Sequence, residues 1–301
     1  MSAELRQILQ DKLGDRARFE QPMSAHTTWG VGGAAWCVCR VTSEEEAGFV
    51  IRSTREAGLP WMPLGRGSNL LVSDKGYPGV MLRLAGPLAS SRREDEKVWA
   101  GGGAHLPAVV KLTARLGLAG LEWAAGIPGT VGGAVATNAG AMGSDMSQIT
   151  SQITLLLANG EVRNLPGGQL AAQYRKRDLP EQSLVLAALL QLALDSPEAV
   201  SLRSEEALAQ RNKSQPSGQP SAGSVFKNPP GDFAGRLIEE AGCKGLSVGG
   251  AQVSQMHANF IVNRGRATAR EVLGLMREVQ QKVRETSGVE LEPEVEVVGD
   301  V

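Results

Sequence analysis

Two glycine-rich stretches constrain this chain more than any other feature of its sequence. The first is Gly65-Arg66-Gly67-Ser68-Asn69-Leu70-Leu71, and the second runs from Gly126 to Gly143. The chain holds 37 glycines, and they cluster rather than repeat at a fixed period. Clustered glycine is typical of backbone that turns tightly or approaches a ligand closely. The alternative is a loop-rich β protein whose glycines only close turns. The two interpretations are compatible with each other.

The composition narrows the class of protein. Hydrophobic residues make up 42% and charged residues 21% of 301 residues, which is typical of a globular chain with two or three packed units. The net charge is −1, and no basic stripe marks a nucleic-acid partner. No run approaches the roughly 20 apolar residues of a membrane span. Residues 1–6 lack the apolar core of a signal peptide, so we expect a cytoplasmic protein.

The three cysteines are Cys37, Cys39 and Cys243. An odd count with one Cys-x-Cys pair provides neither a disulfide framework nor a complete zinc set, so no metal site is predicted. Cys37 and Cys39 share one face of an expected strand. We interpret them as buried small apolar residues.

The periodicity of apolar residues predicts a mixture of helices and strands. Thr268-Ala269-Arg270-Glu271 is a capping box, and Asn159-Gly160 predicts a type I′ hairpin turn. Helices are expected over residues 4–15, 44–57, 107–116, 203–213, 233–241 and 268–288. Strands are expected over 36–41, 61–64, 70–73, 80–84, 98–100, 149–157, 161–165, 183–194 and 289–298. The polar segment Ser214–Ser221 predicts a domain boundary near residue 210.

The first glycine stretch does not fit a Rossmann dinucleotide site. Leu70 stands where the third glycine belongs, and residues 70–72 predict a strand where that site needs a helix N-terminus. No Walker A sequence is present either. Consecutive loop amides can instead point inward and bind an anion without any helix. Gly65 and Gly67 would permit that turn, and residues 126–133 could supply a second wall. Taken singly, each stretch is equally well explained as a structural turn.

Six further segments follow the first glycine stretch in the sequence. Together with the two glycine stretches, and in this order, they form a specific set of motifs. They are Asn138-Ala139-Gly140-Ala141, Tyr174-Arg175, Pro220–Pro229, Gly249–Ser254, His257–Asn263 and Leu291-Glu292-Pro293-Glu294-Val295. From about residue 24 to the C-terminus this set resembles the UDP-N-acetylenolpyruvoylglucosamine reductase family, in its shorter, second type. The longer type carries a capping loop with a tyrosine after the position of Pro229, and that loop is absent here.

The resemblance implies an α+β chain with the two-subdomain FAD-binding fold of vanillyl-alcohol oxidase (the PCMH type) and a smaller α+β substrate-binding domain. The FAD-binding domain would span residues 1–209, with its subdomains split near 80–85. The substrate-binding domain would span 210–301, with its C-terminal strand returning to the active site. The oligomeric state stays open, with a monomer as the working expectation.

The implied reaction uses two partners, NADPH and a UDP-amino-sugar. NADPH would reduce non-covalently bound FAD, and hydride from flavin N5 would reduce the enolpyruvyl ether of UDP-N-acetylglucosamine enolpyruvate. The product would be UDP-N-acetylmuramate for peptidoglycan synthesis. Preference for NADPH over NADH cannot be read from the sequence, because no separate dinucleotide motif exists.

Three residues match catalytic positions of the family. Arg175 would lie near the substrate carboxylate, which a guanidinium can bind through two donors. Ser224 would donate the proton that completes reduction, and Glu294 would assist the enolate-like intermediate. Strand alternation cannot choose between Glu292 and Glu294, and we prefer Glu294 from the family's terminal Glu-Val pair. The alternatives are a solvated basic loop at Arg175, a simple turn at Ser224 and a solvent-facing row of glutamates.

The resemblance also implies binding residues. Those expected to contact the cofactor are Trp61, Leu64, Gly65, Arg66, Gly67, Ser68, Asn69, Leu70, Ile127, Pro128, Gly129, Thr130, Gly132, Gly133, Asn138 and Gly140. Those expected to contact the substrate are Tyr174, Lys213, Asn228 and His257. His257 fits a structural histidine equally well.

Two other functions stay open. One is a different flavin oxidase or dehydrogenase of the same fold, for which His26 or His105 near the glycine stretches could attach flavin covalently. The other is a nucleotide-sugar or flavin-binding regulatory protein without turnover. Three departures from the family pattern, Ala34-Ala35-Trp36, Arg66 and Met142, would change the lining of a flavin pocket without removing a catalytic position.

Overall fold

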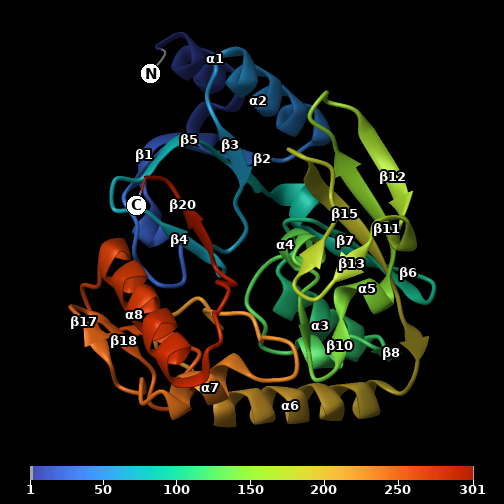
Figure 1. Cartoon of the computed structure of the whole chain (residues 1–301). Helices are drawn as coiled ribbons and strands as arrows, with labels where there is room; N and C mark the ends of the chain where they lie inside the picture. Colours follow the sequence, from blue (N-terminus) through green and yellow to red (C-terminus); the bar gives the residue numbers. More distant parts are fainter. Residues whose placement is uncertain (1–2, 301) are drawn as a thin grey trace. The chain divides into compact units, whose positions relative to one another are not determined.

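A computed structural model describes residues 3–300 of the chain, drawn in Figure 1. The chain forms two compact units. Unit 1 contains the described residues up to Phe19 together with Cys37–Gly65 and Gly79–Gln210. Unit 2 contains Glu20–Trp36, Arg66–Pro78 and the described residues from Arg211 onward. Unit 2 thus combines the C-terminal third of the chain with two short segments from the N-terminal third, whereas the predicted domains were two continuous ranges. The assignment of a function to each range stays a prediction.

The main element of unit 1 is a five-stranded antiparallel sheet with the order β12-β11-β15-β7-β6. Its strands are β6 (Ser91–Glu94), β7 (Lys97–Gly101), β11 (Thr150–Leu156), β12 (Val162–Pro166) and β15 (Leu184–Gln191). The core beside it includes Leu106, Leu118, Ile153 and Leu190, all without exposed surface. This sheet confirms the strands predicted at 149–157, 161–165 and 183–194.

A second sheet has four strands in the order β1-β2-β5-β3, and its last pair is parallel. The strands are β1 (Ala17–Pro22), β2 (Ala34–Val41), β3 (Trp61–Pro63) and β5 (Tyr77–Leu84). In β2, Cys37 and Cys39 are fully buried with their sulfur atoms 3.6 Å apart, as predicted from their spacing. The short strands of unit 1 are β8 (Leu118–Ala119), β9 (Gly140–Ala141), β10 (Ser144–Asp145), β13 (Ala172–Gln173), β14 (Lys176–Arg177) and β16 (Ala193–Leu194).

Capping groups set where the helices begin. In α2 (Glu44–Glu56), Ser43 Oγ accepts from Glu46 N at 3.1 Å, as its hydroxyl-then-acid sequence predicts. Glu46 then forms a two-point ion pair with Arg16, which lowers the pKa of Glu46 to about 2. The other helices that begin in unit 1 are α1 (Ala3–Leu13), α3 (Leu106–Arg115), α4 (Val131–Ala136), α5 (Met146–Ile149) and α6 (Pro197–Ser214).

Unit 2 is organised around the long helix α8 (Ala269–Ser287). Its predicted capping box is present at Thr268 and Glu271, and both oxygens of Asp74 accept from the next amides at 2.8 and 2.9 Å. Gly288 ends the helix in the left-handed conformation, with φ of 72°. One face of α8 buries a stripe at helical spacing, namely Val272, Leu275, Met276, Val279 and Val283. This face packs on the three-stranded sheet β17-β18-β19 (Figure 1).

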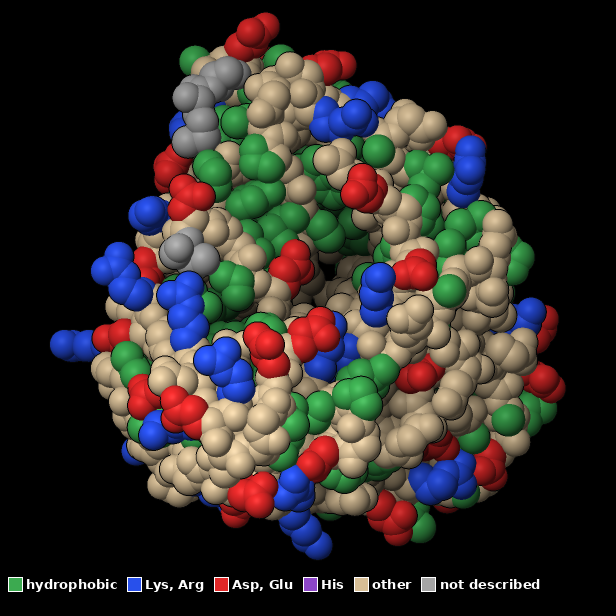
Figure 2. Space-filling view, in the orientation of Figure 1, with side chains coloured by type: hydrophobic (Ala, Val, Ile, Leu, Met, Phe, Trp, Pro, Cys, Tyr) green, Lys and Arg blue, Asp and Glu red, His purple; other side chains and the backbone are tan. Residues whose placement is uncertain are grey.

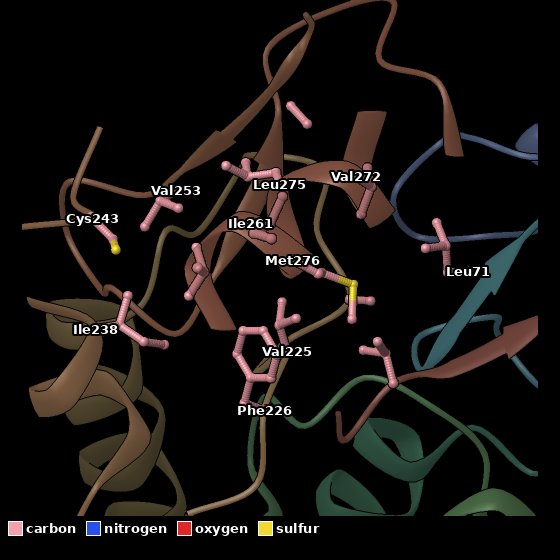
Figure 3. Packing of buried hydrophobic residues seen from close by; sticks show 14 of the residues in the cluster. Leu71, Val225, Phe226, Ile238, Cys243, Val253, Ile261, Val272, Leu275 and Met276 are labelled. Atoms are coloured by element: carbon pink, nitrogen blue, oxygen red, sulfur yellow. The ribbon is translucent and has the colours of Figure 1, made fainter. Parts of the chain in front are cut away.

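The remaining elements of unit 2 complete its core. They are β4 (Leu70–Val72), α7 (Ala234–Glu240), β17 (Ser247–Val248), β18 (Ala251–Val253), β19 (Ile261–Asn263) and β20 (Glu296–Val298). Strand β20 pairs in parallel with β4, which brings the C-terminal strand beside the end of the first glycine stretch. Figure 3 shows Phe226 and Val225 among the side chains of Ile238, Ile261 and Met276. The segment before α7 is therefore part of the core rather than a free linker.

Two local predictions were wrong. The C-terminal strand covers only residues 296–298, not 289–298, because the segment changes partner along its length. Pro293 makes an isolated bridge to Phe226, and only residues 296–298 pair with β4. The turn between β11 and β12 is not type I′, which needs positive φ at both central residues, since Gly160 has φ of 85° but Asn159 is not in that region.

Two broad expectations can be compared with the structure. No helix within residues 3–300 is both long enough and apolar enough to cross a lipid bilayer. Figure 2 shows basic and acidic side chains interspersed over the visible face, in keeping with the net charge of −1.

Candidate active site

The first glycine stretch is a loop that joins β3 to β4. Gly67 has φ of 63°, and a Cβ there would lie 2.1 Å from the His26 carbonyl oxygen, so only glycine fits. Among the described residues, the amides of Gly65, Arg66 and Gly67 donate to no backbone carbonyl. The loop leads into strand β4 and not into a helix, which agrees with the rejection of a Rossmann site. These amides are therefore not used by the backbone of the described residues, and their use for an anion stays a prediction.

The second glycine stretch has a different construction. Its backbone enters the short helix α4, where Thr130 Oγ1 caps the amide of Gly133 at 3.4 Å. The amides of Val131 and Gly132 donate to the carbonyls of Ala104 and Gly102 at 2.9 and 2.8 Å. These three amides are already bonded within the protein. Residues 131–133 therefore do not provide a second wall of available amides.

Within unit 1, the two glycine stretches meet at one point. A Cβ built on Gly65 would lie 3.0 Å from Thr130 Oγ1. In the four-stranded sheet, Trp61 pairs with Val80, and its indole Nε1 is buried with no hydrogen-bond partner among residues 3–300. A buried donor without an acceptor is rare in folded proteins and indicates that a group bound by the protein would satisfy it.

The Tyr174–Arg175 motif forms the turn of a hairpin between β13 and β14. Arg175 has φ of 58°, which is uncommon for a residue other than glycine and is found at functional sites. Its guanidinium donates from Nη1 to the Gly140 carbonyl at 2.9 Å and lies 5.4 Å from the ring centre of Tyr174. The hairpin is thus anchored to the end of the second glycine stretch, so Arg175 has a defined direction and is not part of a solvated basic loop.

Asn138 provides the second anchor of this hairpin. It is 3% exposed, donates from Nδ2 to the Gln173 carbonyl at 3.1 Å and accepts from Ser147 N at 2.9 Å. Its side chain is therefore occupied by the protein, although the sequence assigned it to the cofactor. Arg177, two residues after Arg175, is buried and donates to the Gly167 carbonyl at 2.9 Å.

In unit 2, three predicted segments lie together around Ser224. The next residue, Val225, donates its amide to the Asn259 carbonyl at 2.9 Å and accepts at its carbonyl from Glu294 N at 2.8 Å. Asn69 of the first glycine stretch donates from Nδ2 to the Glu294 carbonyl at 3.2 Å, although the two residues are 225 positions apart in sequence. Gly223, with φ of 76°, turns the chain just before Ser224. Direct hydrogen bonds therefore hold together segments from opposite ends of the chain.

The two candidate glutamates have different surroundings. The Glu292 side chain is 70% exposed and forms an ion pair with Lys227, whose amide also donates to the Glu292 carbonyl. Glu294 is half-buried, and its backbone is bonded on one side to Val225 and on the other to Asn69. The backbone of Glu294 therefore directly adjoins the segment that carries Ser224.

An open pocket of about 530 Å³ lies beside Ser224 in unit 2. Two of the predicted substrate residues, Asn228 and His257, line it with Ser224. Asn228 Oδ1 caps α7 by accepting from Ala234 N at 3.0 Å. Lys213 is exposed in the last turn of α6 and is not among the residues that line this pocket.

A hydrogen bond orients the ring of His257 and selects its tautomer. Its Nδ1 accepts from Asn259 N at 3.2 Å, so the proton is on Nε2. Burial, with a smaller effect of Lys244, lowers the pKa of His257 below its usual value, so the ring is neutral at pH 7. His257 therefore offers a neutral N–H donor and no charge.

Several residues of this region were not identified from sequence. Asn259 bonds to the backbone of Phe226 twice, at 3.0 and 2.8 Å, and so fixes the serine segment. The pocket is also lined by Phe233, Gly235, Arg236, Glu239, Met256 and Ala258. No sequence pattern distinguishes these from ordinary surface residues. Of the other histidines considered, His105 pairs with Thr130 and His26 ends a short 3-10 turn; among the described residues no group of three or more potential metal ligands occurs.

Comparison with known proteins identifies the family. A family model described as the UDP-N-acetylenolpyruvoylglucosamine reductase C-terminal domain matches residues 215–298, and one described as an FAD binding domain matches 35–166. The UDP-N-acetylenolpyruvoylglucosamine reductase of Heliobacterium modesticaldum is 47% identical over 283 residues, covering 93% of this chain and 90% of the relative. The enzyme of the same name from Bacillus velezensis is 39% identical over 295 residues, covering 97% of both chains.

A solved structure agrees with these relatives. The crystal structure of UDP-N-acetylenolpyruvylglucosamine reductase from Thermus caldophilus superposes with a TM-score of 0.83 at 40% identity, covering 94% of this chain and 100% of that one. This likeness and the FAD binding domain confirm the predicted α+β FAD-binding fold. The chain therefore belongs to the UDP-N-acetylenolpyruvoylglucosamine reductase family, a family of FAD-dependent oxidoreductases of peptidoglycan synthesis.

Proposed function

We propose that this chain uses NADPH to reduce the enolpyruvyl ether of UDP-N-acetylglucosamine enolpyruvate to UDP-N-acetylmuramate, in the cytoplasm. The observation that carries the proposal is the set of hydrogen bonds that joins Asn69, Val225 and Glu294, because Glu294 is bonded on one side to the serine segment and on the other to the first glycine stretch. FAD, when bound, supplies the hydride chemistry that no amino-acid side chain can provide.

The residues present fit FAD. A diphosphate offers only acceptors, and the amides of Gly65, Arg66 and Gly67 are donors that bond to no backbone carbonyl among the described residues. The buried Nε1 of Trp61 is a further donor for an acceptor group of the cofactor. Ser68 and Asn69 continue the same loop, with Asn69 linking it to Glu294. We therefore assign the cofactor diphosphate to the first glycine stretch.

Arg175 would bind the substrate carboxylate. Hydride addition to the methylene carbon of the enolpyruvyl group builds up negative charge on the neighbouring carbon and its carboxylate, and a preorganised cation stabilises that charge. The bond from Arg175 to the Gly140 carbonyl fixes one edge of the guanidinium, and the backbone strain at φ of 58° indicates that the position is held by its surroundings. Tyr174, 54% exposed in the same turn, would contact the substrate beside it.

Ser224 would donate the proton that completes the reaction. A serine hydroxyl is a weak acid, so it can serve only when it is held close to the carbon that it protonates and near a polarising group. The fixed backbone of Val225 provides the first condition. The backbone of Glu294 adjoins this segment, so its carboxyl group would assist the enolate-like intermediate. Glu292 is a poorer candidate because its carboxylate is paired with Lys227.

The pocket beside Ser224 would hold the UDP-sugar. Asn228 and the Nε2–H of His257 are neutral donors in it, and Lys213 in α6 would add a positive charge for the diphosphate. Because His257 is neutral at pH 7, we assign it a hydrogen-bonding role and no acid–base role.

The test is Ser224→Ala, examined in the two half-reactions separately. Reduction of bound flavin by NADPH should keep its wild-type rate, while reoxidation by the enolpyruvyl substrate should slow by roughly 10²–10⁴-fold, the usual contribution of a positioned acid. Stopped-flow absorbance measures both rates. Ser221→Ala, in the same segment, is the matched control and should leave both rates unchanged. Wild-type reoxidation in Ser224→Ala would show that Ser224 is not the proton donor.

A further inference from the structure

One pocket residue is exposed in a way that its surroundings do not explain. Phe233 has 67% of its surface exposed, more than any other large hydrophobic side chain within residues 3–300. Met256, on the same pocket, is 53% exposed. Two nearby aromatic residues, Phe226 and Phe260, are instead 1% and 4% exposed in the core. Unit 2 therefore buries aromatic rings efficiently, yet leaves this one at the pocket.

Hydrogen bonds fix the backbone of Phe233, although its side chain is exposed. It is the N-cap residue of α7, where its amide donates to Asp232 Oδ1 at 2.7 Å and its carbonyl accepts from Leu237 N at 3.2 Å. These bonds fix the position from which the ring extends. The ring is thus an apolar surface presented at a defined place, and leaving it in water costs free energy that a covering ligand would recover.

The rest of the pocket offers donors and little free negative charge. Arg236 is bonded to Asp232 and Glu240, and the carboxylate of Glu239 is paired with Lys244. His257 presents a neutral Nε2–H, and a Cβ on Gly235 would lie 3.3 Å from its Cε1, so the small residue makes room for the ring. Apolar side chains beside neutral donors suit a planar heteroaromatic ring that carries carbonyl oxygens.

We propose that Phe233 and Met256 hold the uracil ring of the UDP-sugar, with Phe233 stacking on the face of the base. This inference rests on the proposed function, since it names the part of that substrate which these residues contact. An aromatic side chain stacks on a base through its π face, and such a contact typically contributes a large share of nucleotide affinity. Phe233 would act on substrate affinity and not on the chemical step.

The experiment measures the Kd of UDP for the FAD-loaded enzyme by calorimetry. Phe233→Ala should raise this Kd by about 10-fold, within the range expected for loss of one stacked base, and Phe233→Tyr should stay within about 2-fold of wild type. Met256→Ala should raise the Kd by about 3-fold, since a thioether contact on a ring is weaker. Leu202→Ala, which removes a similarly exposed side chain on α6 in unit 1, is the control and should change nothing.

A second probe separates stacking from a general loss of the pocket. Inorganic pyrophosphate has no base, so its affinity should be equal in wild type and Phe233→Ala. In turnover, the KM for the enolpyruvyl UDP-sugar should rise with the UDP Kd while kcat and the rate of flavin reduction by NADPH stay unchanged. An unchanged UDP Kd in Phe233→Ala, or an equal loss of pyrophosphate affinity, would overturn the assignment of Phe233. If the wild-type enzyme itself neither binds UDP nor reduces the substrate, the proposed function fails instead.

Discussion

Gly67 in the first glycine stretch and Gly132 in the second both allow close packing, but the backbone amides around them differ in their hydrogen bonding. Around Gly67, three consecutive amides donate to no backbone carbonyl within residues 3–300. Around Gly132, the amides of residues 131–133 bond to Ala104, Gly102 and Thr130. The first stretch keeps its donors for a ligand, whereas the second uses them to start a helix and to attach it to the neighbouring loop. Glycine content alone therefore does not identify an anion site.

The element that comes after each stretch accounts for the difference. The first stretch leads into strand β4, whose ladder begins only at Leu70 and leaves the loop amides outside any regular structure. The second leads through Thr130 into helix α4, whose first amides are satisfied by the carbonyls of Ala104 and Gly102 and by the Thr130 side chain. We therefore expect substitutions in the first stretch to affect cofactor binding and substitutions in the second to affect folding. Replacing one glycine of the first stretch and two of the second by alanine tests this.

Gly67→Ala should have the largest effect. The left-handed φ of 63° costs an alanine about 1–2 kcal/mol, and the new Cβ would meet the His26 carbonyl oxygen at 2.1 Å, so the loop must move. We expect purified protein with little or no FAD, measured as flavin absorbance per mole of chain. Urea unfolding of the apo-protein should show a loss of about 3 kcal/mol or more in the free energy of unfolding, since both strain and overpacking act.

Gly58→Ala is the matched control for this strain. Gly58 also has a left-handed φ, of 68°, but nothing lies within 4 Å of its added Cβ. It should lose only about 1 kcal/mol of stability and keep its FAD. Equal flavin content in Gly67→Ala and Gly58→Ala would contradict the assignment of the diphosphate to the first stretch.

Gly132→Ala should have an intermediate effect, and on folding rather than on the cofactor. Its φ is not in the left-handed region, but the added Cβ would lie 2.9 Å from the Gly102 carbonyl oxygen and 3.2 Å from that of Val185. Overpacking against backbone of this kind typically costs about 1–3 kcal/mol. Urea unfolding of the apo-protein measures this loss. The remaining folded protein should retain FAD, and a complete loss of FAD at unchanged apo-stability would show that Gly132 approaches the cofactor.

The sequence could name candidate catalytic residues but not the residues that support them. Arg175, Ser224 and Glu294 could be named because the motifs that carry them occur in a fixed order. Their anchors could not, because the bonds of Asn259 to Phe226, and of Asn138 to Gln173, join residues far apart in the chain. Alternation also could not distinguish the surroundings of Glu292 from those of Glu294, since only the structure shows the ion pair between Lys227 and Glu292.

The fold was predictable where local physics decides it. The capping box at Thr268, the glycine end at Gly288 and the hydroxyl cap at Ser43 are all present as expected. The C-terminal strand was predicted too long because alternation does not show that the segment changes partner, from Phe226 at Pro293 to β4 at Glu296. The composition of unit 2 could not be predicted either, because it depends on two N-terminal segments packing with the C-terminal third of the chain.

Gly133→Ala should have the smallest effect on folding and is the sharpest test of the second stretch. Its added Cβ would lie 3.6 Å from Thr130 Oγ1, an ordinary contact, and the residue is inside α4. Replacing a helical glycine by alanine should stabilise the apo-protein by up to about 1 kcal/mol, measured by urea unfolding beside Gly132→Ala. Because the apo-protein folds at least as well, any change in flavin content reports on the cofactor alone. We expect FAD retention to be unchanged if only the first stretch holds the diphosphate. A stable apo-protein that no longer keeps FAD would instead mean that the backbone at Gly133 lies against the cofactor, and that both stretches hold it despite the different use of their amides.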